Sequence, residues 1–459
     1  MKNLFLFLMA VCISVAVQAQ ISKTITDLTP GELFTKMSTL ELYTVTNLTL
    51  SGTIDARDFK TMRDNMLQLA VIDLTQVNIA EYTGGEGTHW NMTYPVNFIP
   101  ERAFLSKISL TSVTLPNSIT SIEKEALNGC SNLYSVNIPS SVTNIKAGAF
   151  FMCSLLTSIY IPASVIEIGS SAFSGCSANI TVDSENSNYS NIEGVLFNKT
   201  QTALIQCPIS KSGKYTIPSS VKIINEQAFS YCKNLTSVIL PNSVTTIEIS
   251  AFSDCYGLKS VSLPNSLTEI GVAAFQNCPG LTSVSIPNSI SIIGNGAFAG
   301  CENLLSINIP ASVLFLEDVV FQNCTKLASI YAYSTIPAVL PFSSTFSGVD
   351  KNTCALYVPA GSMDLYKAAN VWKDFTKIEA LITSTDKEIK TDLVTVWPNP
   401  AKDLLTINAE KGSVSIYNYN GKLEITQSLE YDKLVNIGSL TPGMYLVLVN
   451  GICYKIIKD

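Results

Sequence analysis

Residues 235–255 read LTSVILPNSVTTIEISAFSDC, and close copies of this stretch recur along most of the chain. The cysteine that closes it returns every 23 residues, except for one step of 232 − 176 = 56 residues, which is 23 plus an insertion of 33. A fixed period of this length indicates one small structural unit that is repeated and stacked. The cysteines of the series are Cys130, Cys153, Cys176, Cys232, Cys255, Cys278, Cys301 and Cys324.

Other positions of the unit are equally regular. An isoleucine or leucine lies eight residues before each cysteine, and a proline lies nine residues after most of them. The residue three before each cysteine is large and apolar, and we expect it in the interior of every coil. These residues are Leu127 in the first unit and then Phe150, Phe173, Phe229, Phe252, Phe275, Phe298 and Phe321.

The unit predicts a short strand followed by a compact turn. Val136 and Ile138 alternate with Ser135 and Asn137, a pattern typical of a strand with one buried face. One unit cannot bury its apolar side chains alone, so successive units must stack as a parallel sheet with strands about 4.8 Å apart. A period of 23 residues lies in the leucine-rich-repeat range. We therefore expect an α/β-type repeat solenoid, a right-handed leucine-rich-repeat coil.

The periodic cysteines occupy one equivalent position beside the predicted core. We interpret them as a ladder of buried thiols that act as small apolar side chains. Cysteines on neighbouring strands can also come within disulfide distance, so pairing stays open as an alternative. No closely spaced Cys-x-x-Cys pairs of the kind that bind zinc are present. The sequence predicts neither a metal site nor a cofactor.

The outward positions of the predicted strands form the candidate ligand face. Uncharged hydroxyl and amide groups with a few aromatic rings suit polar protein surfaces or sugars. The alternative is that small polar residues merely allow the coils to stack closely. The candidate residues are Thr114, Asn137, Tyr160, Ile239, Ser262, Ser285, Asn308 and Tyr331.

Composition excludes several classes of function. The net charge of −7 and the absence of a Lys/Arg cluster give no electrostatic drive toward nucleic acid. The only histidine, His89, lies in a glycine-rich loop. A single imidazole excludes multi-histidine metal sites, and it limits catalysis by a nucleophile with a histidine base to arrangements built around this one residue. A paired-carboxylate glycosidase needs no histidine, but the carboxylates are scattered through the repeats. We expect no catalytic residues and no enzymatic activity.

The order of segments indicates export and several distinct parts. Residues 1–19 have a positive start, an apolar run and small residues before a cleavage site between Ala19 and Gln20, as in a secretory signal peptide. No later segment is apolar enough to cross a membrane. We expect an N-terminal cap and divergent first repeat over 20–95, then repeats over 96–349 with a hairpin insertion near 180–213, a closing unit over 350–382, and a polar linker over 383–391.

Residues 392–459 have a different pattern. Short β-rich runs, such as 404–407, 413–417 and 444–449, are separated by the turn signals Asn420-Gly421 and Pro442-Gly443. This pattern predicts a small all-β, immunoglobulin-like sandwich that forms a separate domain.

The repeats resemble the BspA-like leucine-rich-repeat family of bacterial surface proteins. The segments that carry this resemblance are 235–247 and 251–255, the insertion around 194–208, and 356–362 with Tyr366, Trp372 and Phe375. The resemblance covers about 96–382 and implies a cell-surface protein that adheres to host matrix proteins, other bacteria or host cells.

The tail resembles the type A C-terminal sorting domain of the Bacteroidetes type IX, or Por, secretion system. This resemblance implies export across the outer membrane by that machinery, with the tail removed and the protein left at the surface or released. The residues that carry it are Pro398, Asn399, Pro400, Gly421, Gly443, Tyr445 and Lys458.

These expectations lead to three hypotheses of function. The first is an adhesin that recognises host matrix or bacterial surface protein. The second is a glycan-binding accessory surface protein, for which soluble sugars would compete. The third is a structural component of the cell envelope without a ligand.

Overall fold

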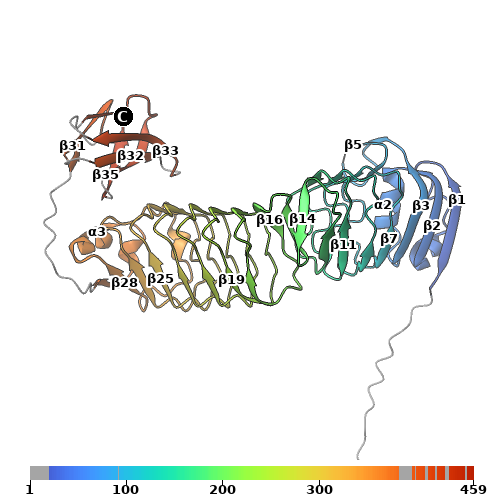
Figure 1. Ribbon diagram of the computed structural model, residues 1–459, viewed down its shortest axis with the longest axis horizontal. Coiled ribbons are helices and arrows are strands. Elements are labelled where there is room, and N and C mark those ends of the chain that lie inside the picture. Colours follow the sequence, from blue (N-terminus) through green and yellow to red (C-terminus); the bar gives the residue numbers. More distant parts are fainter. Residues whose placement is uncertain are drawn as a thin grey trace, which may run out of the picture.

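A computed structural model describes residues 20–90, 92–381, 395–397, 400–408, 412–418, 421–429, 434–449 and 452–459. Residues 20–381 form one long coil of stacked turns, and the residues from 395 onward form a separate small β domain (Figure 1). The signal peptide with Ala19, the whole predicted linker over 383–391, and Pro398 and Asn399 lie outside the described residues.

The longer strand of each turn builds the main side of the coil. In the N-terminal half, five parallel strands pair in the order β1 (Ser22–Leu28), β2 (Asn47–Ile54), β3 (Val71–Ile79), β7 (Ser112–Thr114) and β9 (Ser135–Val136). Helices α1 (Thr39–Thr44) and α2 (Ala56–Asp64) follow β1 and β2. Residues 20–95 therefore continue the same sheet and add three strands to it.

The C-terminal half carries the longest sheet, which we call the main sheet. Its parallel strands are β17 (Gly213–Thr216), β19 (Leu235–Ile239), β21 (Ser260–Ser262), β23 (Ser283–Ser285), β25 (Ser306–Ile309), β27 (Ser329–Ala332), β28 (Ala355–Val358) and β29 (Lys377–Ala380). Strand β25 ends immediately before Pro310, because proline has no N–H to donate to the ladder. Between the halves, β11 (Ser158–Ile161) pairs with β13 (Asn179–Val182).

Two-residue strands form the second side of the coil. They are β6 (Phe98–Ile99), β8 (Ser121–Ile122), β10 (Asn144–Ile145) and β12 (Glu167–Ile168) in one half, and β18 (Ile223–Ile224), β20 (Thr246–Ile247), β22 (Glu269–Ile270), β24 (Ile292–Ile293) and β26 (Phe315–Leu316) in the other. A separate hairpin, β4 (Tyr82–Gly84) with β5 (Met92–Tyr94), projects from the N-terminal region.

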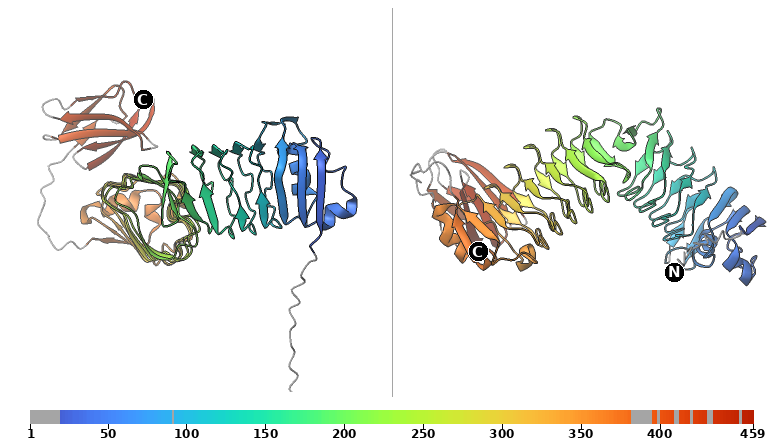
Figure 2. Two further views of the ribbon diagram at one scale, coloured as in Figure 1. Left: turned by 45° about the vertical axis from the view of Figure 1, so that its right-hand side comes forward. Right: turned by 90° about the horizontal axis from the view of Figure 1, so that it is seen from below.

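The insertion lies between the two halves and joins their cores. It consists of the antiparallel strands β14 (Tyr189–Ile192), β15 (Val195–Asn198) and β16 (Ala203–Gln206). Leu196 packs into the N-terminal core, whereas its neighbours Val195 and Phe197 pack into the C-terminal core. Strand β15 is therefore buried on both faces, and the axis of the coil changes direction near it (Figure 2, right).

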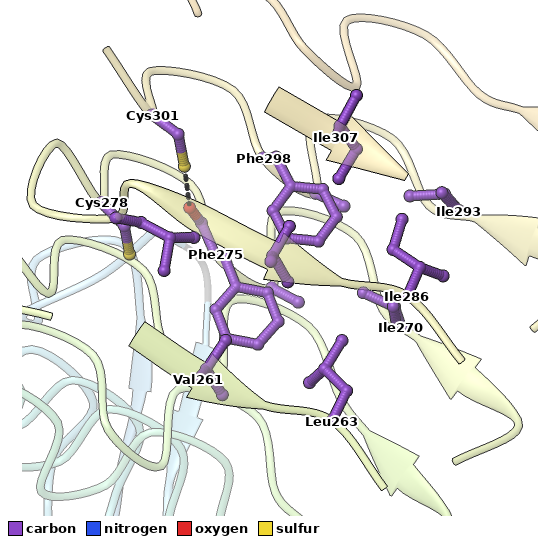
Figure 3. Packing of buried hydrophobic residues seen from close by; sticks show 14 of the residues in the cluster. Val261, Leu263, Ile270, Phe275, Cys278, Ile286, Ile293, Phe298, Cys301 and Ile307 are labelled. Carbon is purple, nitrogen blue, oxygen red and sulfur yellow. Dashed lines mark hydrogen bonds between the residues drawn. The ribbon is translucent and has the colours of Figure 1, made fainter. Parts of the chain in front are cut away.

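The core is a column of stacked rings. Phe275 lies between Phe252 and Phe298, with ring centroids 5.1 and 5.4 Å apart and planes within 3° of parallel. Aromatic pairs favour offset stacking at such distances, and each ring is fully buried among the isoleucines and valines of the strands (Figure 3). The stack continues through Phe321 to Phe346, which the period does not predict because it comes 25 residues after Phe321.

Aromatic side chains of the closing unit end the coil. The unit contains η1 (Ser343–Phe346), η2 (Ala360–Ser362), α3 (Met363–Ala368) and η3 (Trp372–Asp374). Trp372 and Phe375 lie 5.4 and 5.2 Å from the ring of Phe346. The indole N–H of Trp372 donates to the carbonyl of Ala338 at 2.9 Å, so its polar atom is satisfied inside the cap. These contacts cover the last phenylalanine of the column.

The periodic cysteines line the interior as free thiols. Each of the eight is buried, and so are Cys207 and Cys354. The thiol of Cys301 donates to the carbonyl of Phe275 in the preceding coil at 3.2 Å (Figure 3). Cys278 donates likewise to the carbonyl of Phe252 at 3.1 Å. Each coil therefore has one weak sulfur hydrogen bond to its neighbour.

The C-terminal domain consists of two antiparallel sheets around one core. One contains β30 (Thr395–Trp397), β31 (Leu404–Asn408) and β34 (Leu434–Asn436), and the other contains β32 (Gly412–Asn418), β33 (Leu423–Leu429), β35 (Gly443–Val449) and β36 (Ile452–Lys458). The domain contacts the coil through an apolar cluster in which Leu446 packs against Leu314 and Phe315. Tyr417 and Leu448 of the domain, and Ile292, Ile336 and Val339 of the coil, pack against this cluster.

Candidate functional site: the outward face of the main sheet

The main sheet brings five of the predicted face residues into one continuous row. The backbone register pairs Ile239 with Ser262, Ser262 with Ser285, Ser285 with Asn308, and Asn308 with Tyr331. Side chains alternate between the two faces of a strand, so these residues point away from the core while Val261, Val284 and Ile307 point into it. These five residues, together with Tyr357 and Glu379 of the closing unit, are called the outward row.

Two residues of the closing unit extend the outward row. Tyr357 pairs with Tyr331, and Glu379 pairs with Tyr357 on the next strand. The rings of Tyr331 and Tyr357 stack with centroids 4.9 Å apart and planes 11° from parallel. The negative charge of Glu379 raises the pKa of Tyr357. The hydroxyl of Tyr357 can donate a hydrogen bond to a partner.

The sequence pattern missed Tyr357 and Glu379 because the period changes at the closing unit. Tyr357 comes 26 residues after Tyr331 instead of 23. The alternation of Leu356, Tyr357 and Val358 was the available signal, since it has the buried–outward–buried order of the repeat strands. A search for that alternation without a fixed spacing would have found the pair.

The remaining predicted residues lie in the N-terminal half and do not join the outward row. Thr114 is exposed on β7, whereas Asn137 follows β9 and accepts a hydrogen bond from the backbone N–H of Leu115 at 2.8 Å. Tyr160 on β11 is 52% exposed, and its hydroxyl donates to Asp183 at 2.5 Å. That hydrogen bond raises the pKa of Tyr160 and lowers the pKa of Asp183. Asn137 therefore has a structural partner, and Tyr160 belongs to a separate surface.

The described part of the chain contains no cluster suited to a metal ion. No group of three or more His, Cys, Asp or Glu side chains there is arranged to hold a metal ion. The backbone N–H of His89 donates to the hydroxyl of Tyr94, which in turn donates to the carbonyl of His89, both at 2.6 Å. These bonds tie the backbone at His89 to the β4–β5 hairpin.

Among the described residues of the predicted sorting motif, Gly443, Tyr445 and Lys458 lie at one end of the β35–β36 pair, whereas Gly421 lies in the turn between β32 and β33. Gly443 pairs with Lys458, and the residue after Pro400, Ala401, forms a bridge with Lys458. The hydroxyl of Tyr445 donates to the carbonyl of Thr441 at 2.8 Å and closes the preceding turn. These contacts place the described motif residues within the fold of the tail domain.

The regular coil and its buried columns match a known family model. The BspA type leucine rich repeat region matches residues 97–215 and 207–328 in six copies, which together span half of the chain. The chain belongs to the BspA-type leucine-rich-repeat family. The secretion system C-terminal sorting domain matches residues 395–458. This BspA-type protein is therefore exported through type IX secretion to the cell surface or the extracellular space.

Solved structures agree with this assignment. The chain is similar to a leucine-rich cell surface protein from Faecalibacterium prausnitzii, with 30% identity, a TM-score of 0.51 and coverage of 67% of this chain and 82% of that one. It shares its fold with the pneumococcal vaccine antigen PcpA, with 22% identity, a TM-score of 0.57 and coverage of 74% and 80%. No curated protein matches the chain. Among the residues that the structure describes, no helix is long and apolar enough to span a membrane.

Proposed function

We propose that this protein is a non-catalytic adhesin that binds a protein on host matrix or on another bacterial surface through its outward row. The observation that carries the proposal is the row itself. Neutral hydroxyl and amide groups line up over adjacent strands and end in the stacked pair Tyr331 and Tyr357.

The tyrosine pair is suited to be the anchor of such an interface. Tyrosine is enriched among residues that dominate binding energy, because a rigid ring offers a large apolar face and one polar tip. Stacking holds Tyr331 and Tyr357 in place before binding, so little side-chain entropy is lost when a partner covers them. On the other side of the pair from Glu379, the neutral residues Asn308 and Ser285 can add hydrogen bonds without the desolvation cost of a buried charge.

The test is binding of the full chain to immobilised fibronectin, laminin, collagen and bacterial surface extracts, measured by surface plasmon resonance. We expect saturable binding to at least one of these surfaces, weakened by about tenfold or more in Tyr331→Ala and Tyr357→Ala. The control is Tyr134→Ala, which removes a tyrosine that is 54% exposed in the N-terminal half. Saturable binding that both row variants leave unchanged would contradict the proposal, and no binding at all would favour a structural role in the envelope.

A further inference from the structure

A hollow lies beside the main sheet where its strands β21 to β27 end. It has a volume of about 470 Å³ and is open to solvent, within the size range of small-ligand sites. Its lining contains no charged residue. The polar and aromatic residues that line it are Asn265, Ser285, Asn288, Asn308 and Tyr333.

Two departures from the repeat create this hollow. Tyr333 takes the place that proline has in the preceding coils, and its backbone N–H donates to the carbonyl of Ile309 at 3.0 Å. The ring stands 45% exposed as one wall of the hollow. One coil earlier, Ala311 takes the place of the asparagine found at Asn265 and Asn288, and the shorter side chain leaves space beside the ring.

The asparagine amides that line this space have no side-chain hydrogen bond within the described part of the chain. In the same turns, the hydroxyls of Ser266 and Ser289 donate to backbone carbonyls of the preceding coil. Within the described part of the chain, no side-chain hydrogen bond engages the amides of Asn265, Asn288 or Asn308. In these two Pro-Asn-Ser turns the serine therefore bonds to the preceding coil and the asparagine is left available.

We infer that this hollow binds a neutral oligosaccharide, with Tyr333 stacking on a sugar ring and Asn265, Asn288 and Asn308 bonding its hydroxyls. An amide offers both donors and an acceptor, which matches hydroxyl groups that also do both. Equivalent asparagines lie one strand spacing apart, about 4.8 Å, so neighbouring amides can bond to one extended chain. The flat face of Tyr333 is the one large exposed apolar surface in the lining.

Charge favours a neutral ligand over an acidic one. The lining holds no Lys or Arg to pair with a carboxylate or sulfate, and the whole chain carries a net charge of −7. The hollow borders the outward row through Ser285 and Asn308, but its wall is Tyr333 and not the tyrosine pair. The variants that test the inference are therefore at Tyr333 and Asn288, which are not part of the outward row.

The experiment is isothermal titration of the full chain with maltohexaose, cellohexaose, laminarihexaose and mannohexaose, with hexagalacturonate as the acidic comparator. We expect saturable binding of at least one neutral sugar. The variant Tyr333→Ala should weaken it by about tenfold, and Asn288→Ala by several-fold, whereas Tyr333→Phe retains the ring and should bind like the wild type. Tyr134→Ala is the matched control for loss of an exposed tyrosine elsewhere.

Three results would overturn the inference. The first is that none of the neutral hexasaccharides binds. The second is that wild type, Tyr333→Ala and Asn288→Ala bind a neutral sugar equally well. The third is that hexagalacturonate binds more tightly than every neutral sugar. Thermal unfolding of each variant shows that the fold is retained. Because Tyr331→Ala and Tyr357→Ala test the outward row, loss of sugar binding and loss of protein binding are distinguishable.

Discussion

The buried phenylalanine of each coil is the residue on which stacking depends most. Phe275 is fully buried and contacts a ring on each side, so its loss removes packing in two neighbouring coils as well as its own transfer free energy. A shorter side chain would leave a cavity that the regular backbone cannot close, because each coil is held to the next by backbone hydrogen bonds.

We expect Phe275→Ala to lower the free energy of unfolding by about 3–5 kcal/mol. Urea denaturation followed by circular dichroism measures this change. The control is Phe342→Ala, because Phe342 is 51% exposed and its loss should cost less than about 0.5 kcal/mol. Equal effects of the two substitutions would show that the stacked column is not the source of stability.

The cysteine ladder makes stability depend on pH in the alkaline range. Burial raises the pKa of Cys130 to about 12 and raises the pKa of Cys278 well above the ordinary value of 9.0. Since the thiols of the unfolded chain ionise first, the stability that the buried thiols contribute is full below pH about 9 and is lost as pH rises above it.

We expect the free energy of unfolding to fall between pH 8 and pH 10, by about 1 kcal/mol for each strongly shifted thiol. Urea titrations across this range measure the slope. Cys278→Ala should show a smaller fall than the wild type, because one of the shifted thiols has been removed. A fall that Cys278→Ala leaves unaltered would exclude this thiol as a cause.

At the level of elements, close approach between successive coils requires glycine at particular turns. Gly271 follows β22, and a Cβ atom there would lie 2.7 Å from the carbonyl carbon of Glu248 and 2.9 Å from the carbonyl oxygen of Ile247. Both contacts are with backbone of the preceding coil, which cannot move without breaking the ladder between β20 and β22.

The expected effect of Gly271→Ala is a loss of about 1–3 kcal/mol of stability from forced separation of two coils. Gly361→Ala provides the comparison, because no atom lies within 4 Å of the corresponding Cβ position. Thermal melts of the two variants compare them directly. If Gly271→Ala unfolds at the same temperature as the wild type, the coils are less closely constrained than these contacts indicate.

On the scale of the whole molecule, the coil and the C-terminal domain have separate cores. The core of the tail includes Val414, Ile416 and Val447 and shares no residue with the core of the coil. The apolar link between them in the described residues is the cluster of Leu446 with Leu314 and Phe315, against which Tyr417 and Leu448 of the tail and three side chains of the coil also pack. Removal of the tail during export should therefore leave the coil folded.

We expect residues 20–381 to unfold at the same temperature as the full chain within about 2 °C, as measured by calorimetry. Deletion of residues 395–458 in the producing bacterium should leave the protein in the periplasm, detected by cell fractionation. Since the truncated coil is folded, failed export would reflect the missing signal. A large drop in unfolding temperature would instead assign a structural role to the tail.

Local repetition was enough to predict the coil. The spacing of Cys255, Cys278 and Cys301 defines each turn, and the long step after Cys176 locates the hairpin β14–β16. These features are readable because every coil must bury the same side chains against its neighbours, so the period is imposed on the sequence itself. The sorting tail was likewise visible as an ordered set of short motifs.

The candidate binding surfaces were decided by tertiary structure. The pairing of Tyr331 with Tyr357 depends on a strand that breaks the period, and the separation of Tyr160 from the outward row depends on the insertion between the two halves. The hollow beside Tyr333 needs Asn265 and Ala311 from two other coils. A sequence pattern reports which side chains are buried along one strand, whereas a binding surface depends on the register between strands far apart in the chain.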